Sequence, residues 1–432
     1  MNGQIPVRKT RGPSGPHLPG ASPSGAGTSP QLLNSLLTSC DVIPDPRDPR
    51  GRRYGLPTLL TIMICAMTGA GHDSLTAVHE WCQRTALNAP HVLDLLKLPR
   101  DPFTGTLCVP DERTFRDLAA KLDAAALTTA GFGFLRPLLK AAGPADHTPD
   151  GVREREQHRV HRAGLAEPAR RQAYALDGKY LRGARRADGT QVIVLSVVRQ
   201  GDGVTVAMRE IAAKSSEIPE FTPLLRQIPA GQLRNAVITA DALHAQRSHA
   251  TDVVEQLGAH YLLTVKNNQR KLADQLRTLP WKDVPVLHSQ TGRGHGREEV
   301  RRIKVVTVDG LLFPHAKQVL RIERRRRRIG AKKWSTETVY AVTDLPAEQA
   351  SPKELATWAR EHWTVENTVH WSRDCTFNED KCQVRTGNAP AVLAAIRDLV
   401  RGALHTAGYA NIATGRRGHT NPEQVLTLYR IT

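Results

Sequence analysis

The stretch Ala173-Tyr-Ala-Leu-Asp177 opens the part of the chain that decides the fold class. Two more runs of β-branched and apolar residues follow at 191–198 and 204–211, separated by turns that contain glycine. A helix-like stretch leads to a fourth strand-like run at 235–241, and a helix at 246–257 leads to a fifth at 260–265. The order β-β-β-α-β-α-β predicts an α/β fold in which a mixed sheet is flanked by helices.

The residues on either side of this region predict the other domains. Residues 1–30 are about half Gly, Pro and Ser. Because such a segment has too few apolar groups to offset the conformational entropy lost on folding, we expect a disordered tail. Helical periodicity predicts an all-helical domain over 31–142. The remaining predicted segments are a linker at 143–171, the α/β domain at 172–410 with a β-rich insertion at 280–346, and a C-terminal tail at 411–432.

Composition excludes several classes of protein. The 432-residue chain carries 60 Lys and Arg against 42 Asp and Glu, and its net charge of +18 favours a polyanionic partner. The longest apolar run, 59–67, is about half of the roughly 20 residues that a membrane span needs. No secretory signal, C-x-x-C pair or G-x-x-x-x-G-K-[ST] motif is present, so we expect a cytoplasmic protein that uses no membrane, disulfide framework or phosphate-binding loop.

Two aspartates follow strand-like runs, where open α/β sheets place their chemistry. Asp177 ends the first run and precedes Gly178-Lys179, and Asp241 ends the fourth run. A carboxylate at the end of an apolar strand is costly unless it is paired or holds a cation. Taken alone, each aspartate is more simply interpreted as a turn residue or a helix N-cap.

A third acidic residue lies in a predicted helix at 360–374. Trp363, Glu366, His370 and Asp374 recur at steps of three and four, so we expect them on one side of that helix. Carboxylates, imidazoles and indoles make a poor core and a good wall for a site. A solvated charged face is the alternative, but tryptophans are unusual on an exposed helix.

Asp177, Asp241 and Glu366 together meet the requirement of a two-metal phosphoryl-transfer site. In such a site two divalent ions about 4 Å apart activate the attacking hydroxyl and stabilise the leaving oxygen. Carboxylate oxygens are hard ligands, so two Mg²⁺ (or Mn²⁺) ions are the expected cofactors.

The sequence also resembles the DDE transposases of bacterial insertion sequences, in the branch that includes the H-repeat-associated proteins. Matching blocks occur in order from Asp45 to Leu404 and cover most of the chain. They include Leu176-Asp-Gly-Lys-Tyr-Leu-Arg-Gly183, Thr239-Ala-Asp-Ala-Leu-His-Ala-Gln246, Tyr261-Leu-Leu-Thr-Val-Lys-Asn-Asn-Gln269, residues 360–371 and Phe377-Asn-Glu-Asp380.

The resemblance implies an RNase H-like catalytic core in which Asp177, Asp241 and Glu366 hold the metal ions. Glu366 follows Asp241 by 125 residues, which leaves room for the β-rich insertion before the catalytic helix. The sequence departs from the family pattern in two places. Ser216 stands where relatives usually have Asn, and Arg373 and Cys375 flank Asp374 in place of apolar residues.

The predicted insertion is strongly basic. Residues 288–334 contain 14 Lys and Arg against 4 Asp and Glu. Each phosphate that a cation neutralises releases counterions, so the segment predicts binding to duplex DNA with strong salt dependence. A solvated hairpin tip, or a basic tract that binds RNA non-specifically, is the alternative. The family's insertion domains lie over the active site and contact the transposon end. The predicted DNA-binding residues are Arg297, Arg301, Arg324, Arg325, Arg326, Arg327, Arg328, Lys332 and Lys333.

A second group of polar residues is expected to support the carboxylates or to contact DNA. Amide and ammonium groups at the ends of strands can bind phosphate or a base edge. A turn or a helix end is the structural alternative for several of these positions. The candidates are Lys179, His244, Gln246, Lys266, Gln269, His370 and Asp374.

These features predict an insertion-sequence transposase. The helical domain and the basic insertion are expected to recognise terminal inverted repeats, while the carboxylates direct strand cleavage and joining of the freed 3′-hydroxyl to target DNA. The expected partners are double-stranded DNA, as transposon ends and target, and a second copy of the chain in a synaptic dimer at the bacterial nucleoid. The rival interpretations are an RNase H-like nuclease or resolvase, and a catalytically inactive DNA-binding protein derived from a transposase.

Overall fold

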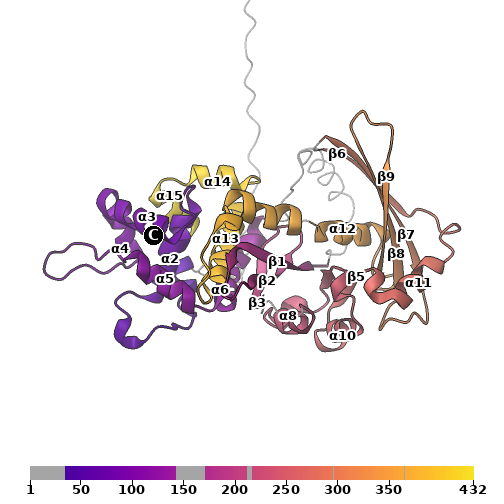
Figure 1. Cartoon of the computed structure of the whole chain (residues 1–432), viewed down its shortest axis with the longest axis horizontal. Helices are drawn as coiled ribbons and strands as arrows, with labels where there is room; N and C mark the ends of the chain where they lie inside the picture. Colours follow the sequence, from indigo (N-terminus) through magenta and orange to yellow (C-terminus); the bar gives the residue numbers. More distant parts are fainter. Residues whose placement is uncertain (1–34, 143–170, 212–216, 295, 364) are drawn as a thin grey trace, which may run out of the picture. The chain divides into compact units, whose positions relative to one another are not determined.

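One mixed sheet of nine strands, in the order β3-β2-β1-β4-β5-β9-β8-β7-β6, organises the chain (Figure 1). β1, β4 and β5 are parallel, and the other neighbouring pairs are antiparallel. The strands are β1 (Ala173–Arg185), β2 (Gln191–Arg199), β3 (Thr205–Ile211), β4 (Val237–Ala240), β5 (His260–Val265), β6 (His288–Gly294), β7 (Arg297–Thr307), β8 (Gln318–Arg328) and β9 (Ser335–Thr343). The predicted α/β class with a mixed sheet is confirmed.

The structure is a computed structural model and describes residues 35–142, 171–211, 217–294, 296–363 and 365–432. The tail expected at 1–30 lies outside the described residues, as do Ser216 and all of the expected linker except Arg171.

β1 is longer than predicted. Asp177, Gly178 and Lys179 continue the strand and pair with β2, so the expectation that Asp177 ends a strand is wrong, as is the alternative that Asp177 is a turn residue. The reason is that buried and exposed side chains keep alternating beyond Asp177, as a strand requires. The parallel pairing with β4, in contrast, stops at Leu176 and Ala240. Asp177 therefore lies inside β1 but just beyond its last parallel pair.

The β-rich insertion extends the central sheet. β9 pairs along β5 from Leu262 to Val265, and β8, β7 and β6 follow outward in antiparallel order. α12 (Pro352–His362) packs on this part of the sheet, because its Leu355 and Trp358 are buried with Leu320 of β8. The insertion is thus continuous with the strands that carry the aspartates.

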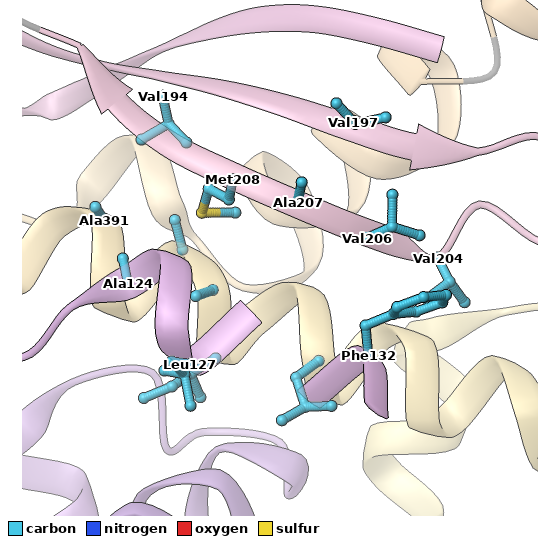
Figure 2. Close-up of a cluster of buried hydrophobic side chains, with 14 of the residues drawn as sticks. Ala124, Leu127, Phe132, Val194, Val197, Val204, Val206, Ala207, Met208 and Ala391 are labelled. Carbon is cyan, nitrogen blue, oxygen red and sulfur yellow. The ribbon is translucent and has the colours of Figure 1, made fainter. Parts of the chain in front are cut away.

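α6 (Ala124–Ala142) and α13 (Ala389–Thr406), from distant parts of the chain, cover β2 and β3. Figure 2 shows Leu127 and Phe132 of α6 beneath Val194 and Met208. Met208 and Asp177 both pair with Ser196, so α6 lies on the face of the sheet that carries Asp177. Burying a side chain such as Leu127 stabilises the fold by about 1.5–3 kcal/mol. The helical segment is therefore packed onto the sheet.

The other helices are short, and several begin at a proline or a capping side chain. The helices of the N-terminal segment are α1 (Leu36–Ser39), α2 (Leu56–Thr68), α3 (Leu75–Asn88), α4 (Pro90–Leu95) and α5 (Glu112–Lys121). Those between strands are α8 (Phe221–Leu225), α9 (Ala230–Leu233), α10 (Arg247–Thr251) and α11 (Arg270–Thr278). Within the described ranges, no single helix has both the length and the apolar character to cross a membrane, although α5 and Ala124–Leu139 meet those criteria as a bent pair.

Residues 411–432, expected as a tail, form α14 (Ile412–Gly418) and α15 (Pro422–Leu428). Leu426 and Tyr429 are buried, and the Tyr429 hydroxyl lies 2.7 Å from the hydroxyl of Thr68 in α2. The C-terminal end therefore completes the core of the N-terminal helices, because its apolar side chains recur at helical spacing.

Candidate active site

Three carboxylates from separate segments approach one another at the end of the parallel strands. Asp177 lies in β1 just beyond its last pair with β4, and Asp241 directly follows β4. Because the two strands run side by side in the same direction, their next residues are neighbours. Glu366 approaches from the segment that follows α12, on the face of the sheet that carries Asp177.

α12 is fixed at both ends. Ser351 and Glu354 form a capping box at its beginning, which satisfies free backbone donors there. At its end, His362 Nδ1 lies 3.0 Å from the hydroxyl of Thr239, two residues before Asp241. Burial lowers the pKa of His362 to about 4, so the imidazole is neutral at physiological pH. This neutral contact ties the end of α12 to β4.

The segment after α12 is anchored on β1 by apolar and charged contacts. Val365 and Val369 are buried with Ala175 of β1. Two residues further along β1, an oxygen of Asp177 lies 3.7 Å from His370 Nδ1. Two residues further again, the ammonium of Lys179 lies 2.7 and 2.8 Å from the two oxygens of Asp374. The helical segment therefore lies along β1, and every second residue of the strand contacts it.

The predicted helix at 360–374 is not one continuous α-helix. It changes to π-helical turns at Val365–His370 and Ser372–Thr376, and π-helical turns are rare and often mark functional sites. The expectation that its tryptophans are shielded is wrong, because Trp363 is 43% and Trp371 56% exposed. The contacts of His370 and Asp374 with β1, and not the indoles, identify the buried side.

Burial and nearby negative charge perturb the acidity of the Asp177 carboxyl. Desolvation raises its pKa to about 7, and the negative charges of Glu366, Asp241 and Glu217 act in the same direction. A hydrogen bond of 2.9 Å from the backbone N–H of Gly178 opposes this shift. In the described part of the chain, no three His, Cys, Asp or Glu side chains close into a ready set of metal ligands. The carboxylates are thus near enough to repel one another, although they do not form a preassembled set of metal ligands.

The burial of Asp177, together with repulsion from the other carboxylates, predicts that Asp177→Asn stabilises the protein at high pH. A carboxyl whose pKa is raised from 3.8 to about 7 in the folded state binds more protons there than in the unfolded state. Its contribution to stability is present below pH 4 and is lost as pH rises through 7. We expect the variant to exceed the wild type at pH 8 by on the order of 2–4 kcal/mol, and to match it near pH 4. Urea denaturation at both pH values measures the difference, and a difference that is independent of pH would contradict the assignment.

Lys179 and His370 contribute different charges to the site. Lys179 is only 7% exposed and is paired with Asp374. Desolvation, with the charges of Arg373 and Lys179, lowers the pKa of His370 to about 3. His370 is therefore a neutral neighbour of Asp177, and the Lys179 ammonium is directed to Asp374.

Arg373, one of the two departures from the family pattern, belongs to a buried ion network. Its side chain is fully buried, 2.8 Å from Glu379 and 3.5 Å from Asp398. Arg397 contacts the same Glu379 at 3.0 Å, and Arg401 lies 3.7 Å from Asp398. Because Arg373 directly precedes Asp374, this network supports the segment that reaches Lys179.

Glu217 is a fourth carboxylate that sequence reasoning left without a role. Its Oε1 lies 2.5 Å from where a Cβ on Gly178 would stand, so a larger residue after Asp177 would displace the Glu217 carboxylate. Its Oε2 lies 3.6 Å from His244 Nε2, and His244 is buried beside Phe221. The adjacency of Asp177 and Gly178 was the available signal, because a strand glycine often marks a close approach by another group.

The ends of β4 and β5 are joined by their loops. Asp241 caps the following turn by accepting a hydrogen bond of 3.0 Å from the Leu243 N–H, so the helix-cap interpretation is correct in geometry. Gln269 donates to Gln246 at 3.2 Å across the two loops. Lys266 is exposed at the end of β5. Gln246 and Gln269 thus share a hydrogen bond between the loops that follow β4 and β5.

The arginine run of β8 is divided between the two faces of the sheet. Arg324 contacts Glu299 at 2.7 Å, whereas Arg327 contacts Glu298, on the opposite face, at 2.6 Å. Arg325 and Arg327 lie over the Trp334 ring, at 5.3 and 4.6 Å from its centroid. A pocket separates this sheet from α12, and Arg301, Arg324, Arg360 and Trp363 line it. Arg297, Arg326, Arg328, Lys332 and Lys333 are exposed.

Comparison with known proteins places the chain among transposases. Residues 167–398 match the family described as "Transposase DDE domain", and residues 37–135 match a family described as associated with it. The Escherichia coli (strain K12) protein named "Putative protein YbfL" is 31% identical over 244 residues, which cover 52% of this chain and 62% of that protein, less than two thirds of its length. "H repeat-associated putative transposase YhhI" of the same strain is 26% identical over 85% of this chain and 89% of its own length. "Putative transposase YncI" of Escherichia coli O157:H7 is 24% identical over 85% and 86%.

Proposed function

The chain belongs to the DDE transposase family, and on that premise we propose that it mobilises an insertion sequence by cutting DNA at the ends of the element and joining the freed 3′-hydroxyl to target DNA. The observation that carries this proposal is the approach of Asp177, Asp241 and Glu366 to one another, which adds to burial in raising the pKa of Asp177. We assign β1 to β5 and their covering helices to an RNase H-like catalytic core, with β6 to β9 as its insertion. The mixed order of β1 to β5 and the position of the carboxylates support that assignment.

The residues at this site fit divalent metal ions. All three candidate ligands offer carboxylate oxygens, which Mg²⁺ and Mn²⁺ prefer. Their mutual repulsion is not offset by Lys179, which pairs with Asp374, so the site favours added positive charge. Two divalent ions bound by Asp177, Asp241 and Glu366 would supply the Lewis acidity that activates an attacking hydroxyl and stabilises the leaving oxygen.

The chain's own residues hold and orient these ligands. Asp241 is oriented by its bond from the Leu243 N–H, and Asp177 by its bond from the Gly178 N–H. The Lys179–Asp374 pair fixes the segment that presents Glu366 over β1. His370 stays neutral beside Asp177, so it adds no cation that would compete for the carboxylates.

We propose that duplex DNA is the substrate and that the basic insertion contacts it. The exposed cations of the insertion lie on the same sheet as the carboxylates, so DNA bound there extends toward the site. We also propose that the helical segment at 31–142 contributes to recognition of the terminal repeats. Joining both ends of one element requires two active sites, which supports a dimer in the complex with DNA.

A strand-joining assay tests the proposed function. Protein is incubated with Mg²⁺, a target plasmid and a labelled duplex that carries the inverted repeat found beside the reading frame. We expect a joined product that disappears when EDTA replaces Mg²⁺. Cleavage without joining would instead indicate a nuclease, and a DNA complex that forms without any metal-dependent product would indicate a DNA-binding protein without transposase activity.

A further inference from the structure

The outer strands β6, β7, β8 and β9 form a four-stranded ribbon that carries arginines on both faces. In Figure 1 these strands extend past α12. Side chains alternate between faces along each strand, so a run of five arginines in β8 cannot lie on one side. The register of β7 with β8 pairs Arg328 with Arg297, Arg326 with Glu299, and Arg324 with Arg301, so these residues share a face.

We call the face that α12 partly covers the inner face, and the opposite one the outer face. The inner face carries Arg297, Arg301, Arg324, Arg326 and Arg328 against two carboxylates, Glu299 and Glu337. The outer face carries Arg293, Arg302, Arg321, Arg325 and Arg327 against Glu298 and Glu323. Each face therefore has an excess of positive charge, and the two excesses point in opposite directions.

The outer face holds two of its arginines in an ordered arrangement. Trp334 lies under the guanidinium groups of both Arg325 and Arg327, and Glu298 also contacts Arg327. A guanidinium stacked on an indole keeps its N–H edge available for phosphate oxygens. Because the stacked side chains are already ordered, less conformational entropy is lost when they bind an anion. This arrangement would be unexpected for a face that is only exposed to solvent and binds nothing.

One duplex cannot use both faces. Side chains on the two faces point in opposite directions, so the sheet itself separates a duplex on one face from the arginines of the other. A duplex against the inner face therefore leaves the outer face open to a different phosphate backbone.

From this geometry we propose that the ribbon binds two duplexes at once, one on each face. The duplex on the inner face is the one nearest α12 and the carboxylates, and the second lies against Arg325 and Arg327. The inference rests on the proposed function, because it takes the inner face to be the site for DNA that is cut. It adds that a single chain brings two DNA segments together.

Two matched double variants test the proposal. Arg326→Gln/Arg328→Gln removes two charges from the inner face, and Arg325→Gln/Arg327→Gln removes two from the outer face of the same strand. The first measurement is affinity for a single end duplex at several salt concentrations. The second is capture of a fluorescent duplex by protein that is bound to a bead-linked end duplex, with either a second end or an unrelated sequence as the fluorescent DNA.

We expect the inner-face variant to weaken single-duplex binding and to lower the slope of log affinity against log salt by about 2. The outer-face variant should keep single-duplex affinity within about threefold, while capture of the second duplex falls at least about tenfold. The two fluorescent sequences show whether the outer face accepts an element end, target DNA or both. Melting temperatures confirm that both variants fold.

Equal loss of single-duplex binding in the two variants would overturn the proposal. Undiminished capture by the outer-face variant would also overturn it, because a dimer that holds one duplex per subunit would then explain the bridging. The proposed function is judged separately, from the joined product that the unaltered protein forms. Joining without a role for the outer face would refute only the inference about the ribbon.

Discussion

Asp241→Asn is expected to abolish strand joining while leaving affinity for DNA within a few-fold of the wild type. The substitution keeps the size of the side chain and an oxygen that accepts the Leu243 N–H at 3.0 Å, so the turn after β4 is preserved. It removes the negative charge that a divalent cation would neutralise. We expect joining to slow by at least about a thousandfold, or roughly 4 kcal/mol in the activation barrier.

The measurement is the rate of joined product with Mg²⁺, alongside a binding titration on the same duplex. Affinity is expected to persist because the exposed arginines of the ribbon supply most of the attraction to phosphate. Asp111→Asn is a matched control, since Asp111 caps α5 by accepting from the Arg113 N–H at 2.8 Å. A variant at Asp241 that still joins DNA at a tenth of the normal rate would remove this residue from the active site.

Among the substitutions considered, Glu379→Gln is expected to cause the largest decrease in the free energy of unfolding. Glu379 is 2% exposed and contacts Arg373 at 2.8 Å and Arg397 at 3.0 Å. Burial opposes its charge, but the two guanidinium groups prevail and hold the pKa of the carboxyl below its usual range. The amide would leave the two buried cations without this counter-charge. Removing one partner of a buried ion pair costs about 3–5 kcal/mol in the free energy of unfolding.

Urea denaturation at pH 7 measures this loss. Asp380→Asn is the control, because the neighbouring carboxylate is 28% exposed and lies 3.5 Å from Arg182, which is itself largely exposed. An ion pair of that kind contributes at most about 1 kcal/mol. If Glu379→Gln destabilised the protein no more than this control, the network would not be a source of stability.

The central strands could be predicted from the sequence because their residues follow simple patterns. The run at 191–198 is buried along nearly its whole length, as a strand between covering layers must be. The end of β4 at Asp241 was also recognisable, since an acidic residue interrupts an apolar run. The end of β1 was not, because Gly178 suggests a turn. In the structure, Gly178 instead leaves space for Glu217, which comes from a distant part of the chain.

The surroundings of Glu366 were harder to predict because they depend on long-range pairs. Arg373 looks like a surface residue in sequence, and its burial requires Glu379 and Asp398, which the local pattern does not reveal. Trp363 and Trp371 show the opposite error. Tryptophan side chains are usually buried, but both of these are substantially exposed. The roles proposed for Asp177, Asp241 and Glu366 remain predictions for the assays above.

The pairing of β9 with β5 fixes how far the arginine tip of the insertion lies from the ends of the central strands. Val265 lies beside Tyr340, and Ser335, five residues further along β9, lies beside Arg326. Five residues of strand extend about 17 Å, and a shared hydrogen-bond ladder gives this reach no hinge about which to change. That length equals roughly five base-pair steps of duplex DNA. The distance between Val265 and the arginine tip is thus set by the length of β8 and β9, and lengthening or shortening both strands of this hairpin would change it.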